Sequence, residues 1–478
     1  MTPPLVDLTI LAAWIAVAVG IGLWSGRRAK SADEYSVGGR DLPAWALFGS
    51  IVATETSTVT FLSVPGLAYR GDLTFLQLPL GYLVGRALVC AFLLPAYFEG
   101  RLMSAYEVLE QRFGGGTRKL ASLVFVAART LGDGLRLYLG AIVLAKLLDL
   151  ELWQAVLALG AVTVLFTFVG GLRAVVWTDV LALVVYVGGA IAALWLLTRE
   201  AGGVDAVLDL AAAQDKLRVF DFSFDPTVPY QFWAALIGGA ALSFGTHGVD
   251  QMFVQRYLAA RSRRAAQGAL IASGVFVLFQ FALFLVLGIA LYAWAQLGSP
   301  PIELARDEEL ATYVAQHLPT GLRGVVLGSI FAAAMSTLSS SLNSSATALA
   351  TDLLFPRVKP TSDAAKVRWI RWLTVGFGLA QIVVALSGPA FDASVVSSAL
   401  AIAGFATGLL LGLFLLGQSQ RGLSDRAAFV GFGTGLVVLL GVRFGTELAW
   451  PWHPLIGAVV TASAGRLYAW RARSGASR

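Results

Sequence analysis

Long apolar stretches separated by short polar ones run through the whole chain. A helix needs about 20 apolar residues to cross a bilayer, and the stretches are close to that length. Hydropathy predicts spanning helices at residues 5–25, 43–68, 74–98, 120–147, 152–171, 174–198, 229–255, 265–295, 322–354, 367–388, 393–417, 427–446 and 453–470. The pattern therefore predicts an all-α integral membrane protein with about 13 transmembrane helices.

The composition supports a bilayer as the surroundings of the chain. Of the 478 residues, 57% are hydrophobic and 13% are charged, whereas soluble domains carry about 25% charged residues. These values exclude a soluble enzyme, a nucleic-acid-binding protein and a disordered scaffold. The single cysteine, Cys90, excludes an internal disulfide and a cysteine metal cluster. Because no Lys or Arg precedes the first apolar stretch, we expect a retained helix there rather than a cleaved signal peptide.

The basic residues predict an orientation, because cytoplasmic loops of membrane proteins are rich in Lys and Arg. Alternate loops, beginning with the loop after residues 5–25, hold most of them, Arg256 included. The opposite loops hold only Arg70, Arg199, Lys216, Arg218, Arg306 and Arg443. We therefore predict that the N-terminus lies outside and the C-terminus inside, and interpret the net charge of +6 as an orientation signal.

A few charged residues fall inside the predicted spans, where each costs at least ~2.5 kcal/mol on insertion scales. Such a residue needs a partner, a water-filled cavity or a functional role. They are Glu55, Arg86, Arg129, Asp133, Arg136, Lys146, Asp179 and Arg323.

Polar residues interrupt two of the predicted helices. Residues 53–60 contain five hydroxyl side chains and the carboxylate of Glu55, and residues 243–251 contain His247 and Asp250 between glycines and polar residues. A break at membrane depth is tolerated where it lines a cavity. Two breaks at corresponding positions are typical of secondary transporters built from inverted repeats, with the binding site at the midplane. A kink made by glycine and serine is the alternative.

One further helix presents a polar face. Ser336, Ser339, Ser340 and Asn343 follow the spacing i, i+3, i+4, i+7 and therefore share one side of the helix. Hydroxyls at this spacing, opposite free carbonyls of a broken helix, would supply the oxygen ligands that a hard cation such as Na⁺ prefers. Close packing of small residues against a neighbouring helix is the alternative.

Six motifs in order along residues 33 to about 355 resemble the sodium/solute symporter family, which includes sodium-coupled sugar, sialic acid, monocarboxylate and pantothenate transporters. They are residues 36–40 (SVGGR), 53–66 (ATETSTVTFLSVPG), 106–114 (YEVLEQRFG), 170–179 (GGLRAVVWTD), 250–258 (DQMFVQRYL) and 335–344 (MSTLSSSLNS). Each motif is weak alone, but the ordered set is specific.

The resemblance implies a LeuT-type fold, in which two five-helix repeats have inverted topology. Residues 1–478 would then form a single polytopic domain, with an extra helix at 5–25, repeats at 43–198 and 229–417, and two extra helices within 427–470. It also implies import of a small polar organic solute, coupled to Na⁺ by alternating access, across the inner (plasma) membrane. No covalent chemistry, nucleic acid or obligatory protein partner is expected.

The resemblance also implies binding residues. One Na⁺ site would use carbonyls of Ala53, Thr56 and Ala333 and the hydroxyls of Ser336 and Thr337. A second Na⁺ site would use Asp179, Ser339 and Ser340, although Asp179 could instead pair with an intramembrane arginine. The residues expected to contact the solute are Glu55, Ser57, Thr60, Gln77, Arg136, Phe244, Thr246 and His247.

The class of solute stays open at this point: a carboxylate, a sugar, an amino acid or a vitamin. Arg136 favours an anion, whereas Glu55 would repel one unless it is protonated or paired, for instance with Arg136. A proton-coupled or sodium-independent carrier of the same fold is an alternative function. An intramembrane enzyme or a sensor is a further one, although a His-Glu-x-x-His motif and a P-loop are absent from the sequence.

Overall fold

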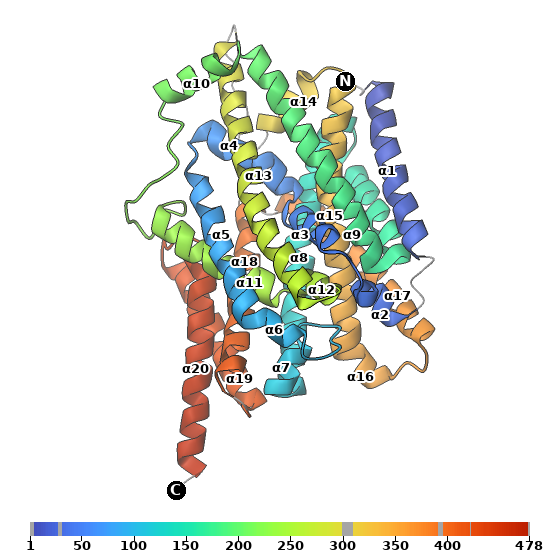
Figure 1. The fold of residues 1–478 in the computed structure, drawn as a ribbon, viewed down its shortest axis with the longest axis vertical. Helices are drawn as coiled ribbons and strands as arrows, with labels where there is room; N and C mark the ends of the chain where they lie inside the picture. The colour runs from blue at the N-terminus through green and yellow to red at the C-terminus, as the bar shows by residue number, and fades with distance from the viewer. Residues whose placement is uncertain (1–3, 27–30, 299–308, 391–394, 421, 477–478) are drawn as a thin grey trace.

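The computed structural model describes residues 4–26, 31–298, 309–390, 395–420 and 422–476, and these residues form helices with no strand among them (Figure 1). The helices are α1 (Leu5–Gly26), α2 (Ala32–Val37), α3 (Ala44–Glu55), α4 (Thr58–Arg70), α5 (Gln77–Leu88), α6 (Leu94–Tyr97), α7 (Glu107–Arg112), α8 (Gly115–Leu148), α9 (Leu152–Glu200), α10 (Val204–Ala213), α11 (Gly239–Val249), α12 (Gln251–Leu258), α13 (Arg263–Leu297), α14 (Glu309–Gln316), α15 (Leu322–Leu349), α16 (Phe355–Val358), α17 (Asp363–Leu386), α18 (Val395–Ser419), α19 (Asp425–Gly445) and α20 (Trp452–Ala476). The predicted all-α class is confirmed.

Among the described residues, seven helices are long and apolar enough to cross a membrane, or eight if the bent pair α3 and α4 forms one span. Two of the predicted spans, 152–171 and 174–198, lie within the single 49-residue helix α9, which bends at Gly171. This glycine has a φ of 60°, and a Cβ there would lie 2.6 Å from the carbonyl oxygen of Tyr35, so only glycine suits the bend. The count of about 13 spans and the orientation stay predictions.

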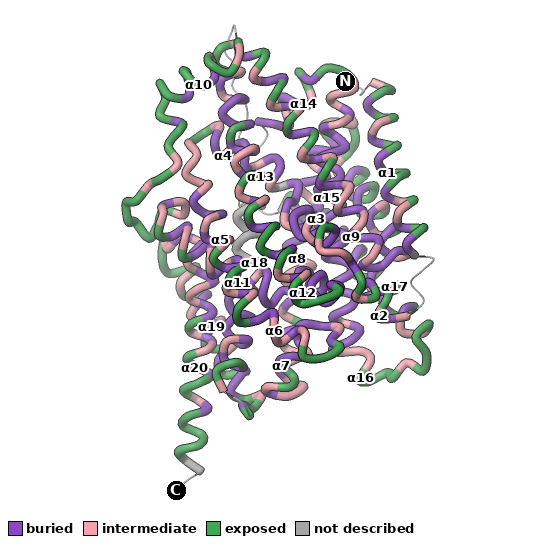
Figure 2. Tube along the Cα trace, in the orientation of Figure 1, coloured by how far each residue is buried: buried purple, intermediate pink, exposed green. Residues whose placement is uncertain are grey.

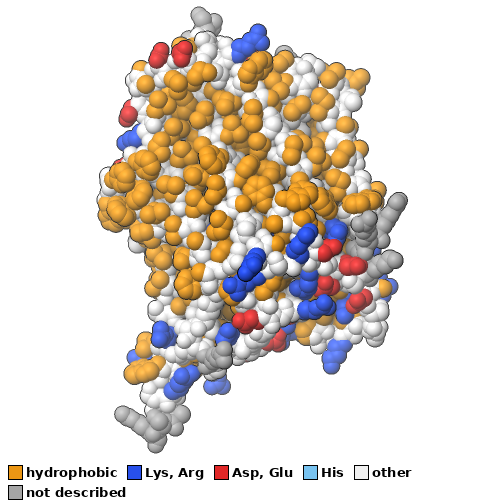
Figure 3. All heavy atoms as spheres, in the orientation of Figure 1, with side chains coloured by type: hydrophobic (Ala, Val, Ile, Leu, Met, Phe, Trp, Pro, Cys, Tyr) orange, Lys and Arg blue, Asp and Glu red, His pale blue; other side chains and the backbone are white. Residues whose placement is uncertain are grey.

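Helix α15 forms the centre of the molecule, because nearly all of its residues are buried (Figure 2). It packs against α9, α8, α1 and α17. The outer helices expose large apolar side chains such as Val17, Val184 and Phe279. Hydrophobic side chains form a broad band across the face shown in Figure 3. The charged side chains on the same face gather mainly beyond one edge of this band. Apolar residues thus occupy both the core and the outside, as expected where lipid is the solvent.

A short loop segment holds the end of α4. The ammonium group of Lys216, which follows α10, donates to the carbonyl oxygens of Tyr69 (2.8 Å) and Gly71 (3.0 Å). The last carbonyls of a helix have no donor within the helix, and Lys216 supplies one. Burial lowers the pKa of Lys216, and the nearby charge of Asp72 opposes this shift.

Helices α5 and α11 approach each other closely through glycine. A Cβ added to Gly85 would lie 2.5 Å from the carbonyl oxygen of Ala240, and one added to Gly81 would lie 2.5 Å from that of Leu236, just before α11. Small residues permit such backbone contacts between membrane helices. This contact matters for the site, because α11 contains part of the second polar interruption.

We expect Gly85→Ala to lower the free energy of unfolding by ~1–3 kcal/mol, the usual effect of overpacking. The backbone of α11 would have to move to accommodate the methyl group. Gly268→Ala in α13 is the matched control, because nothing lies within 4 Å of its added Cβ, and alanine favours a helix over glycine. Thermal unfolding of both purified variants measures the difference. Equal melting temperatures would contradict the close contact.

Candidate functional site

Both polar interruptions of the sequence are breaks in the structure. Helices α3 and α4 are bent by 59° relative to each other, with extended backbone at Thr56 and Ser57. The last helical hydrogen bond of α3 is donated by the N–H of Thr56 to the carbonyl of Val52 (3.0 Å). Helices α11 and α12 meet at Asp250, whose carboxylate accepts from the N–H of Met252 (2.9 Å) and so caps α12.

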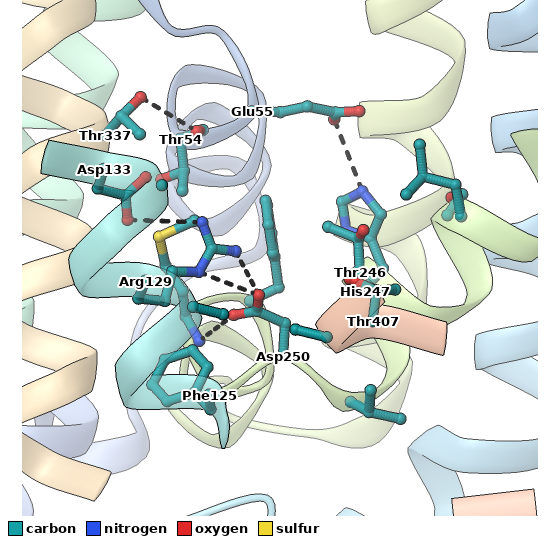
Figure 4. Close-up of a pocket in the computed structure, with 18 of the residues that line it drawn as sticks. Thr54, Glu55, Phe125, Arg129, Asp133, Thr246, His247, Asp250, Thr337 and Thr407 are labelled. Carbon is teal, nitrogen blue, oxygen red and sulfur yellow. Dashed lines mark hydrogen bonds and ion pairs between the residues drawn. The ribbon is translucent and has the colours of Figure 1, made fainter. Parts of the chain in front are cut away.

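A cavity of about 140 Å³ lies between the two breaks (Figure 4). Helices α5, α8, α15 and α18 complete its wall through Tyr82, Phe125, Thr337 and Thr407, among others. Of the residues predicted to contact the solute, five line the cavity: Glu55, Ser57, Arg136, Thr246 and His247.

The other three predicted solute contacts, Thr60, Gln77 and Phe244, are not part of the cavity wall. Gln77 is buried and ties a loop to α5, since its amide donates to the carbonyl of Tyr230 (2.7 Å) and its oxygen accepts from the N–H of Asp221 (3.1 Å). The backbone N–H of Thr60 donates to the Ser57 hydroxyl at the start of α4 (3.4 Å). Phe244 packs in a hydrophobic cluster.

Charged residues on one side of α8 line the cavity and form a row of ion pairs. Arg136 and Arg129 both form ion pairs with Asp133, and the distance between Arg129 and Asp133 is 3.7 Å. Arg129 also reaches across to Asp250 at the second break (Nε–Oδ2 3.1 Å), as Figure 4 shows. The row thus links α8 to α12. Arg136 stands at one end of the row and keeps a side-chain exposure of 20%.

Glu55 is paired with Arg86, and not with Arg136 as the sequence suggested. The guanidinium of Arg86 donates to Glu55, to Nε2 of His247 (3.0 Å) and to the Ser273 hydroxyl (3.1 Å). Nδ1 of His247 lies 3.2 Å from the hydroxyl of Tyr257. Because Arg86 is fully buried and lies beside Glu55, the carboxylate is charge-compensated inside the protein.

Oxygen atoms of the first break and α15 lie close together. The Thr337 hydroxyl is 3.3 Å from the carbonyl oxygen of Thr54 and 3.4 Å from that of Ala333. Hydroxyl and carbonyl oxygens of this kind are the ligands that a hard cation such as Na⁺ prefers. The Thr54 carbonyl was not in the predicted set but lies in this group, and the Ser336 hydroxyl donates to Asp179 (2.6 Å) beside it.

The residues predicted for a second Na⁺ site have other partners. Oδ2 of Asp179 accepts from the guanidinium of Arg256 (2.9 Å), which also donates to the Ser340 hydroxyl. The hydroxyl of Ser339 donates to the carbonyl of Ser336 along its own helix (3.1 Å). Asp179 therefore pairs with a buried arginine, the alternative that the sequence left open. Arg256 itself is fully buried in α12, so the prediction that it lies in a loop was wrong.

Several residues at the cavity were not among the predicted site residues: Tyr82, Arg129, Asp133, Asp250 and Thr407. The sequence does carry a signal for three of them, and Asp250 is one, because it lies in the second polar interruption. Arg129 and Asp133 are charges at membrane depth with spacing i, i+4, which places them on one side of a helix together with Arg136. Tyr82 and Thr407 carry no such signal, because ordinary membrane helices also contain these residues.

Two broken helices that face a central cavity are typical of a secondary transporter. The sodium:solute symporter family model matches residues 35–435. The chain is 31% identical to the human sodium/iodide cotransporter over 458 residues, which is 92% of this chain and 70% of that protein. It is 30% identical to the sodium/sialic acid symporter NanT of Aliivibrio fischeri, over 96% of this chain and 92% of that one. The chain therefore belongs to the sodium:solute symporter family.

Solved structures agree with this assignment. A substrate-bound, outward-open Na⁺-coupled sialic acid symporter superimposes with a TM-score of 0.88 at 26% identity, over 98% of both chains. A nucleobase-cation-symport-1 family transporter shares the fold alone, with a TM-score of 0.61 at 14% identity over 92% of this chain and 95% of that one. The fold is of the LeuT type. The protein is a multi-pass membrane transporter, not an enzyme, and it imports a solute coupled to Na⁺ by alternating access.

Proposed function

We propose that the solute is a small organic anion with a carboxylate group, imported together with Na⁺ across the inner (plasma) membrane. The observation that supports this class of solute is Arg136, which faces the cavity from the end of the α8 row. A guanidinium can bind a carboxylate through two parallel hydrogen bonds. Iodide, monocarboxylates and sialic acid, named for the relatives, are all anions or acids.

The charged groups around the cavity are compatible with binding of an anion. Asp133 is shared between Arg129 and Arg136. The carboxylate of the solute can therefore take the place of Asp133 at Arg136, while Asp133 stays paired with Arg129. Glu55, which would repel an anion, is neutralised by Arg86. Ser57 and Thr246 line the same wall and can contact polar groups of the solute, whereas both ring nitrogens of His247 already have partners in Arg86 and Tyr257.

The Na⁺ ion would bind between the first break and α15, at the carbonyls of Ala53, Thr54, Thr56 and Ala333 and the hydroxyls of Ser336 and Thr337. The oxygens close to the Thr337 hydroxyl support this placement. The second site at Asp179, Ser339 and Ser340 stays a prediction, and the pairing of Asp179 with Arg256 speaks against it. The repeats at 43–198 and 229–417 would each begin with one of the broken helices, as inverted repeats require.

We expect Arg136→Gln to weaken binding of the transported anion by about 10–100-fold, because a hydrogen bond to a charged group contributes ~1.5–3 kcal/mol. Melting temperatures with sialic acid, pyruvate and iodide, each in Na⁺ and in choline, first identify a ligand of the wild-type protein. Uptake of that ligand into proteoliposomes then compares the variants. Arg323→Gln is the matched control, because Arg323 has a similar exposure of 18% and pairs with Asp7 away from the cavity.

Different outcomes separate the alternatives. Uptake that is unchanged when choline replaces Na⁺ would favour a proton-coupled or sodium-independent carrier. A sugar or neutral amino acid that stabilises the protein, while the three anions do not, would contradict the proposed anion. Equal effects of Arg136→Gln and Arg323→Gln would remove the assigned role of Arg136.

A further inference from the structure

Arg256 lies at a junction of four helices. Its side chain is fully buried and extends from α12 to α3, α9 and α15. It donates to the hydroxyl of Ser50 (2.8 Å), to Asp179 (2.9 Å) and to the hydroxyls of Thr54 and Ser340. It also donates to the carbonyl of Met252 in the first turn of α12. Arg256 thus connects Asp179 and Thr54 to α12 through one planar group.

Two partners of Arg256, Asp179 and Thr54, connect it to the proposed Na⁺ site. The Ser336 hydroxyl donates to Oδ1 of Asp179 (2.6 Å), while Oδ2 of the same carboxylate accepts from Arg256. Thr54 makes a second connection, since its carbonyl accepts from Thr337 and its hydroxyl accepts from Arg256. Two paths, one through the carboxylate of Asp179 and one through the backbone and side chain of Thr54, thus run from the proposed Na⁺ group to α12.

The other end of these paths is the solute cavity. Asp250, Met252 and Phe253, at or next to the start of α12, line its wall. A cation on the oxygen of Ser336 polarises its O–H bond and strengthens the hydrogen bond that it donates, since hydrogen bonds in chains reinforce one another. Asp179 and Arg256 would then be held more firmly, and α12 with them.

We propose that Asp179 and Arg256 transmit Na⁺ binding at Ser336 to α12, and so order the wall of the solute cavity. This inference rests on the proposed Na⁺ site. Both residues are positioning residues, because they act on α12 and contact neither the solute nor the Na⁺ ion. Solute and Na⁺ would thereby favour each other's binding, as thermodynamic linkage requires of any coupling between two sites.

The test uses Na⁺ alone and a cysteine at Met252. The chain has one native cysteine, so Cys90→Ser with Met252→Cys gives a single thiol in α12. Met252 is 1% exposed, so a thiol there reacts only when α12 moves away from its neighbours. In this parent protein, Na⁺ in place of choline is therefore expected to slow alkylation by N-ethylmaleimide several-fold. The variant Asp179→Asn/Arg256→Met removes both charges together, since removing one partner of a buried pair leaves the other uncompensated. It should bind ²²Na⁺ as the parent does but lose the protection of the thiol.

Asp352→Asn is the matched control, because Asp352 is also a buried carboxylate, bonded to Arg118 (2.7 Å) and to the hydroxyl of Ser104 (2.7 Å). This variant should keep the Na⁺-dependent protection. Protection that persists in Asp179→Asn/Arg256→Met would overturn the inference. So would loss of ²²Na⁺ binding in that variant, which would make Asp179 part of the ion site itself. Absence of ²²Na⁺ binding to the parent would instead overturn the proposed Na⁺ site, and the inference with it.

Discussion

Replacing Thr337 by alanine is expected to raise the Na⁺ concentration for half-maximal uptake by about 10–100-fold. The Thr337 hydroxyl lies 3.3 Å from the Thr54 carbonyl and 3.4 Å from the Ala333 carbonyl, so it is the shared member of the oxygen group. A polar contact to a charged group contributes ~1.5–3 kcal/mol, which corresponds to that change in affinity. Equilibrium binding of ²²Na⁺ to the purified protein measures the same quantity without a solute.

Ser345→Ala is the matched control for Thr337→Ala. Ser345 is buried in the same helix, and its hydroxyl has no hydrogen-bond partner among the described residues. Its removal should leave the Na⁺ affinity unchanged. A normal Na⁺ affinity in Thr337→Ala would place the ion elsewhere in the protein and would contradict the proposed coordination.

Replacing Arg86 by methionine is expected to lower the free energy of unfolding by ~3–5 kcal/mol, because it leaves the carboxylate of Glu55 without its buried partner. Arg86 is fully buried and bonds to Glu55, His247 and Ser273. Adding Glu55→Gln should restore much of the loss, since the charge that remains unpaired is then removed. Chemical denaturation of the two single variants and the double variant measures this coupling.

The exposed pair of Arg218 with Asp72 provides the comparison for Arg86→Met. Arg218 has an exposed fraction of 51%, and exposed ion pairs typically contribute less than ~1 kcal/mol. Arg218→Met should therefore have a small effect. A similarly small effect of Arg86→Met, or no recovery in the double variant, would show that Glu55 finds another way to be neutralised.

The local pattern of the sequence was enough to predict the elements of the site. Residues 53–60 and 243–251 contain the breaks at Thr56–Ser57 and Asp250, because hydroxyl-rich and glycine-rich segments do not sustain an apolar helix. The helical spacing of Ser336 and Ser340 placed both side chains toward the same partners, Asp179 and Arg256. The family and its coupling to Na⁺ also followed from ordered motifs.

The pairing of charges was not predictable from the same pattern. Arg256 follows an apolar stretch and precedes other basic residues, so hydropathy assigned it to a loop, although it pairs with Asp179 on another helix. Glu55 was matched with the wrong arginine for the same reason, since Arg86 and Arg136 are equally at membrane depth. The amide side chain of Gln77 is typical of a binding residue, but it forms hydrogen bonds with the backbone of a loop.

The sequence by itself determined that the chain is helical, that it lies in a membrane and where its helices break, because these properties depend on apolar length and local hydrogen bonding. Only the tertiary structure decided which intramembrane charges neutralise one another and which face the cavity. An ion pair between buried groups depends on a few ångströms between helices that are far apart in sequence, such as Asp179 in α9 and Arg256 in α12. Helix packing sets those distances, and the residue pattern along a single helix does not contain them.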